Sequence, residues 1–115
     1  MTVTLSTTLR NLSSIPNDAN TNIIRDFYQY LKSTGTSDRY QCQNIKQITN
    51  FARYLGTEGT FYQLTKDGII SFLDTKIKNS IVDPDKKWIT TWNDYLWRIK
   101  YFFRWFHNRY KRGNE

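Results

Sequence analysis

Cysteine and histidine are almost absent from this chain of 115 residues, which contains one of each, Cys42 and His107. A single cysteine cannot form an internal disulfide, and this indicates a reducing compartment and a cytoplasmic location. One cysteine and one histidine also cannot supply the ligand spacing of a zinc site. We therefore expect no metal site, and we expect both side chains to be packed or solvated rather than catalytic.

Long apolar stretches and glycine-rich loops are missing as well. No apolar run approaches the roughly 20 residues that a membrane-spanning helix needs, and the N-terminus lacks the continuous apolar segment of a signal peptide. The glycines are isolated or lie in turn-like positions, whereas a phosphate-cradling loop groups them. These absences argue against catalysis, and we expect no cofactor, no small-molecule substrate and no membrane partner.

Positive charge is present in excess and is unevenly distributed. Lys and Arg total 17 against 10 Asp and Glu, so the net charge is +7 and the pI is about 9.6. Residues 86–115 contain eight basic and two acidic residues, whereas residues 1–85 contain nine and eight. Local basic charge favours phosphates or an acidic membrane as partners. The alternative is a solvated helix face that only aids solubility.

Hydrophobic periodicity predicts one all-α domain over residues 18–112, preceded by a flexible N-terminal arm over residues 1–17. The arm is rich in Ser, Thr and Asn and ends near Pro16. The predicted helices span residues 18–33, 37–55, 65–78 and 86–110. The expected N-caps of these helices are, in order, Asp18 or Asn20, Ser37, Thr65 and Asp85. Gly35 and Gly56 are expected to end the first and second helices.

The last predicted helix has two aromatic faces. Its core face repeats at helical spacing and comprises Trp88, Trp92, Leu96, Ile99, Phe103, Phe106 and Tyr110, widened by Tyr95 and Phe102. Trp97, Tyr101 and Trp105 form a second row at spacing four, and a single helix in a small domain rarely needs two apolar faces. This second row could pack beneath another helix or the arm, contact a protein partner, or lie against nucleic-acid backbone.

The second predicted helix carries an acid-free polar stripe opposite its apolar face. The stripe consists of Arg39, Gln43, Lys46, Asn50 and Arg53, with Gln47 beside it. Lys and Arg bind phosphates, while Arg, Asn and Gln also read base edges. An ordinary solvated face would usually intersperse Glu with Lys, so the pattern favours nucleic-acid contact.

Three segments together resemble the core-binding domain of tyrosine recombinases, the SAM-like N-terminal domain of the phage-integrase family. The segment "DRYQCQNIKQITNFARYLG" resembles the second helix of that domain, with Phe51, Tyr54 and Leu55 at its end. The segments "QLTKDGIISFLDTKI" and "TTWNDYLWRIKYFFRWFHN" resemble its third and fourth helices. The resemblance covers residues 20–110, in the order and spacing of the family.

The resemblance implies a four-helix orthogonal bundle that forms half of a clamp around double-stranded DNA near a crossover site. The implied contacts extend the polar stripe to the last helix. The predicted DNA-binding residues are Arg39, Gln43, Lys46, Gln47, Asn50, Arg53, Lys86, Lys87, Thr90, Thr91 and Arg98. Asp94 lies among them and would either repel phosphate or accept a hydrogen bond from a cytosine amino group.

The family's catalytic domain, with its Arg, His and nucleophilic Tyr, would follow residue 115 and is not in this chain. Residues 113–115 would begin the linker to it. The resemblance therefore implies a DNA-binding module of an integrase or other site-specific recombinase, without catalytic residues of its own. Other recombinase protomers would be its partners in the full-length protein.

Two further interpretations remain open. The chain could be a helical protein–protein interaction domain that uses the face of Trp97, Tyr101 and Trp105, since aromatic residues and Arg are common interface hot spots. A membrane-binding role would depend on the basic, aromatic C-terminal segment alone. We disfavour it because the last helix already has a deep apolar face to bury in a core.

Overall fold

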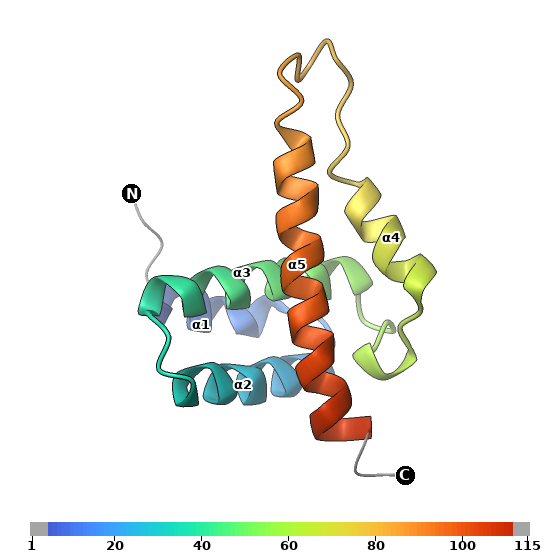
Figure 1. The fold of residues 1–115 in the computed structure, drawn as a ribbon. Coiled ribbons are helices and arrows are strands. Elements are labelled where there is room, and N and C mark those ends of the chain that lie inside the picture. Colours follow the sequence, from blue (N-terminus) through green and yellow to red (C-terminus); the bar gives the residue numbers. More distant parts are fainter. Residues whose placement is uncertain (1–4, 112–115) are drawn as a thin grey trace.

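The structure, a computed structural model, describes residues 5–111, and all of its regular elements are helical (Figure 1). Residues 1–4 of the predicted arm, Arg112 and the predicted linker lie outside the described residues. The elements are α1 (Leu5–Arg10), the 3₁₀ turn η1 (Asn11–Ser14), α2 (Asp18–Ser33), α3 (Asp38–Leu55), the 3₁₀ turn η2 (Phe61–Gln63), α4 (Lys66–Asp74), α5 (Trp88–Phe106) and the π-helical turn η3 (His107–Lys111). The prediction of an all-α fold is confirmed.

α2 and α3 run side by side in opposite directions, and α5 crosses both of them (Figure 1). The C-terminal half of α5 lies against α2, whereas its N-terminal half extends beyond α3, away from α2. α4 lies beside α5, and α1 packs on α3.

Two of the predicted helix caps are confirmed. Ser37 Oγ accepts a hydrogen bond from the Tyr40 backbone N–H at 3.2 Å. Thr65 Oγ1 accepts one from the Gly68 N–H at 3.2 Å. Gly56 follows α3 with φ of 75°, a conformation that glycine adopts without the strain caused by a Cβ atom. Local sequence chemistry therefore determines both ends of α3.

The other two predicted caps, at the starts of α2 and α5, are wrong. Asn17, not Asp18 or Asn20, caps α2, and its side chain accepts from the Asn20 N–H at 3.0 Å. At the start of α5, Asp83 rather than Asp85 accepts from the Trp88 N–H, at 2.9 Å.

Two predicted helices are also shorter in the structure. α5 begins at Trp88 rather than residue 86, because Lys86 has φ of 55° and cannot continue a helix. α4 ends at Asp74 rather than residue 78.

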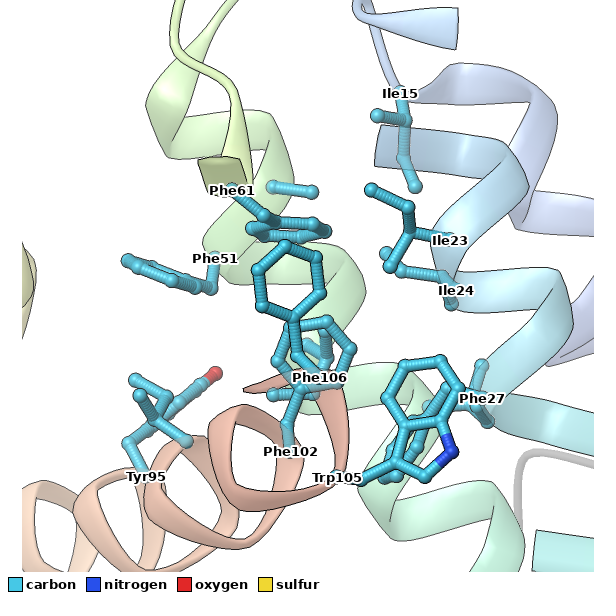
Figure 2. Close-up of a cluster of buried hydrophobic side chains, with 14 of the residues drawn as sticks. Ile15, Ile23, Ile24, Phe27, Phe51, Phe61, Tyr95, Phe102, Trp105 and Phe106 are labelled. Carbon is cyan, nitrogen blue, oxygen red and sulfur yellow. The ribbon is translucent and has the colours of Figure 1, made fainter. Parts of the chain in front are cut away.

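Phenylalanine rings form the centre of the core (Figure 2). The ring of Phe102 lies 5.0 Å from that of Phe27 on α2 and 4.9 Å from that of Phe61 on η2. The predicted core face of α5 is partly confirmed. Its buried members are Tyr95, Ile99, Phe102 and Phe106. Trp92, Leu96 and Phe103 from the same predicted face are partly buried and pack against this core. The buried sector is therefore rotated toward α2.

The second aromatic row of α5 is divided by that rotation. The Trp105 ring lies 5.1 Å from the Phe27 ring, and the Tyr101 ring lies 5.9 Å from it. Burial raises the pKa of Tyr101, and a hydrogen bond with Tyr30 raises it further. Trp97, one turn earlier, is 72% exposed. Packing beneath another helix, one of the three predicted explanations, thus accounts for Tyr101 and Trp105 but not for Trp97.

The C-terminal end of α5 is attached to α2 through Asp26. Its carboxylate accepts hydrogen bonds from the Tyr110 hydroxyl at 2.6 Å and from Arg109 Nε at 3.1 Å. Burial alone would raise the pKa of Asp26, but these two hydrogen bonds hold it below its usual value. Arg109 therefore joins η3 to α2.

The N-terminal segment is helical where the sequence predicted a loosely ordered arm. Thr8, Leu12 and Ile15 are buried, and Thr8 Oγ1 lies 3.0 Å from Cys42 Sγ on α3. Thr8 lies on α1 and Leu12 on η1, while Ile15 follows η1 in an extended conformation. The many Ser and Thr residues around Leu12 and Ile15 gave this segment no apolar periodicity in the sequence.

We expect Leu12→Ala to lower the free energy of unfolding by about 2–5 kcal/mol, because Leu12 is only 1% exposed and its loss would leave a cavity. Urea denaturation measures this change, with the neighbouring exposed Asn11→Ala as the control, expected within about 0.5 kcal/mol of wild type. If both variants matched the wild type, residues 5–15 would not belong to the cooperative core.

Candidate nucleic-acid interface

The polar stripe of α3 lies between α1 and η1 on one side and α5 on the other. Toward the N-terminal segment, Arg53 Nε donates to Ser14 Oγ at 2.8 Å. A small hollow of about 100 Å³ lies along this border and is lined by Lys46, Asn50 and Asn11, among others. The stripe is therefore a band on the surface, flanked but not covered by its neighbours.

On its other side the stripe contacts α5 through two hydrogen bonds. Gln47 Nε2 donates to Asp94 Oδ2 at 2.5 Å. Asn50 Nδ2 donates to the Tyr95 hydroxyl at 3.0 Å. Gln47 and Asn50 are half-buried, so these two predicted DNA-binding residues also hold the crossing of α3 and α5 together.

Asp94 lies where the two helices meet and is engaged within the protein. Besides Gln47, it is paired with Arg98, whose Nε lies 3.4 Å from Asp94 Oδ1. The Arg98 guanidinium also lies over the ring of Tyr40, with its carbon 6.0 Å from the ring centre. Arg98 thus offsets the negative charge of Asp94, which reduces the repulsion of phosphate expected from the sequence.

The remaining predicted residues differ in how far they reach solvent. Gln43 is half-buried. The exposed ones are Arg39, Lys46, Arg53, Lys86, Lys87, Thr90 and Thr91. Phosphate contacts require accessible cations, so the exposed lysines and arginines are the side chains that a duplex could reach without rearrangement.

The accessible residues of α3 and α5 adjoin each other. Thr91, Asp94 and Arg98 follow spacings of three and four, so they share one side of α5, and Lys87, the N-cap residue of α5, precedes Thr91 by four positions. Asp94 contacts Gln47, so this side of α5 borders the stripe of α3. We call the surface formed by the α3 stripe and this side of α5 the α3–α5 corner.

The loop after α4 adds positive charge that the sequence analysis did not assign to the site. A hollow of about 400 Å³ next to Lys87 and Thr91 is also lined by Lys76 and Lys78. Lys76 Nζ lies 4.7 Å from the centre of the Tyr95 ring, and burial lowers the pKa of Lys76. These lysines were overlooked because the predicted third helix continued through them, and helical periodicity does not relate them to the stripe.

Comparison with known protein families, with curated proteins and with solved structures found no match for this chain. Within residues 5–111, no helix is both long and apolar enough to cross a membrane. Among the same residues, no three His, Cys, Asp or Glu side chains gather as ligands of a metal ion would. The α3–α5 corner is therefore interpreted from its own geometry and charge.

Proposed function

We propose that this chain binds double-stranded DNA through the α3–α5 corner. The observation that supports the proposal most strongly is the contact between Gln47 and Asp94, because it joins two cationic helix flanks into one surface. Arg39 and Lys46 on one flank and Lys87 on the other are exposed and available to phosphates. The B-DNA major groove, roughly 12 Å wide, accommodates an α-helix.

The resemblance noted in the sequence gives this proposal a more specific form. We propose that the chain is the core-binding domain of a tyrosine recombinase, in which α2–α5 form the SAM-like four-helix unit. It would then form half of a clamp around the crossover site, beside other recombinase protomers in a cytoplasmic complex. The order of α2–α5 along the chain is compatible with this assignment.

An NMR titration with a duplex tests the proposal. We expect the backbone amides of α3 and of the first turns of α5 to shift, together with those of Lys76 and Lys78. The amides on the exposed side of α2, around Arg25 and Lys32, should remain unchanged. Shifts confined to α2, or no shifts at low salt, would contradict duplex binding at the corner.

A second candidate function rests on the exposure of Trp97. This side chain is 72% exposed and borders a groove of about 480 Å³ that is also lined by Tyr40, Tyr101 and Arg104. Exposed Trp is typical of protein–protein hot spots. Because Tyr101 and Trp105 pack against α2, an interaction surface here would depend on Trp97 and not on the whole row.

A further inference from the structure

A second groove lies between α4 and α5. It has a volume of about 700 Å³. Ile69 and Ile70 from α4 form one wall, Trp92 and Leu96 from α5 form the other, and Phe103 from α5 lies at the floor. We call it the α4–α5 groove.

The walls of the groove are apolar and open to solvent, while its floor is attached to the core. Ile70 is 39% exposed, whereas Ile69 and Leu96 are half-buried. The ring of Phe103 lies 5.9 Å from that of Phe61, so the floor is held by core packing. A preformed, mostly apolar concavity with a few polar groups is the usual form of a binding site.

The rim of this groove is basic. Lys66 on α4 and Lys100 and Arg104 on α5 line it, and no Asp or Glu is among its lining residues. Lys66, Lys100 and Arg104 are exposed. An occupant with acidic residues flanking an apolar surface would form ion pairs with the rim and apolar contacts with the walls.

We propose that the α4–α5 groove binds an amphipathic helix of a partner protein, whose apolar stripe is flanked by Asp and Glu. A groove between two helices receives apolar anchors at positions i, i+4 and i+7 of such a helix. A second copy of this chain is a poor occupant because each copy has a net charge of +7. A flat lipid surface would reach the rim but not the floor formed by Phe103.

The groove and the α3–α5 corner lie on different sides of α5. Leu96 follows Asp94 by two positions, which turns it by about 200° around the helix axis. None of the residues proposed to contact DNA lines the α4–α5 groove, although Lys100 and Arg104 of its rim also line the groove beside Trp97. The inference does not depend on the proposed DNA binding, because its residues and its test are separate.

Synthetic helical peptides test this inference on the full chain. The probe is a fluorescein-labelled peptide of about 15 residues with leucines at i, i+4 and i+7 and glutamate and alanine elsewhere. Comparison peptides either rearrange the same residues so that the leucines no longer share one side, or replace glutamate by lysine. We expect only the first peptide to bind, in fluorescence anisotropy, and to shift the methyl NMR signals of Ile69 and Ile70.

Variants of the chain localise the binding. Ile70→Glu should weaken the peptide affinity at least about tenfold, as the loss of an interface anchor does. Ile81→Glu is the matched control, because Ile81 is 90% exposed and does not line the groove. The Ile81→Glu variant should bind the peptide with wild-type affinity. Double replacement of Lys100 and Arg104 by glutamine should also weaken binding and reduce its dependence on salt.

Several results would overturn the inference. The inference is wrong if the rearranged or the lysine-containing peptide binds as tightly as the acidic amphipathic peptide. It is also wrong if the Ile70→Glu variant is folded and binds the acidic peptide with wild-type affinity. Binding to phosphatidylserine vesicles without binding to the acidic peptide would assign the groove to a membrane surface instead. Circular dichroism of each variant separates lost binding from lost folding.

Discussion

Replacing Lys46 and Lys87 together by glutamine is expected to weaken duplex binding on the order of 60-fold at about 0.1 M salt, if each lysine contacts one phosphate. The estimate follows from counterion release, in which each phosphate contact contributes about 0.9 to the slope of log affinity against log salt. The slope should therefore become shallower by about 2, and affinity should fall for all duplex sequences alike. Anisotropy of a labelled duplex at several salt concentrations measures both quantities.

The double variant Arg25→Gln and Lys32→Gln is the matched control. It removes the same number of charges, but both residues are exposed on α2, which is not part of the α3–α5 corner. We expect its salt slope to remain that of wild type. Equal losses in the two double variants would mean that net charge, and not the corner, determines binding.

Replacing Phe102 by alanine is expected to lower the free energy of unfolding by about 3–5 kcal/mol. Phe102 is fully buried, and its ring packs on the rings of Phe27, Phe61 and Trp105. The substitution leaves a cavity where α2, η2 and α5 meet, and small domains have only about 5–15 kcal/mol of total stability. Urea denaturation followed by circular dichroism should show a large decrease in the midpoint.

Trp97→Ala on the same helix is the control for Phe102→Ala. It removes an even larger aromatic side chain, but one that is 72% exposed, so the expected change is within about 0.5 kcal/mol. A loss at Trp97 comparable to that at Phe102 would mean that Trp97 is buried in solution, for example in a dimer. Light scattering of the wild type at several concentrations would then identify the dimer.

α5 contributes to three surfaces because it crosses the other helices. One side packs on α2 through Trp105, one borders α3 through Asp94, and one lines the α4–α5 groove through Leu96. Its high aromatic content is explained mainly by the first of these. Its basic residues are divided between the other two, with Arg98 at the corner and Lys100 and Arg104 at the groove.

Several features of the fold were predictable from the sequence because they depend on neighbouring residues. The start of α3 at Ser37, the cap at Thr65 and the end of α3 at Gly56 follow from hydrogen bonds and backbone preferences within one helical turn. The all-α class follows from apolar spacing over longer segments. These signals are local, so they do not depend on which elements pack together in the tertiary structure.

The helicity of α1 and the start of α5 were harder to predict. α1 is stabilised by contacts with α3, such as that between Thr8 and Cys42, and its own six residues are too few for a stable isolated helix. α5 begins late because the chain turns at Lys86, and the Trp88 N–H donates to Asp83 rather than to Asp85. Neither outcome is visible in helical periodicity alone.

The sequence by itself determined the helical class, the places where α2 and α3 begin and end, and which residues could form a cationic stripe. Only the tertiary structure decided how that stripe is used. The crossing of α3 and α5 turned Gln47, Asn50 and Arg98 toward contacts within the protein and left Lys46 and Lys87 exposed. The physical reason is that helical periodicity defines the sides of one helix, whereas burial depends on which neighbour covers each side.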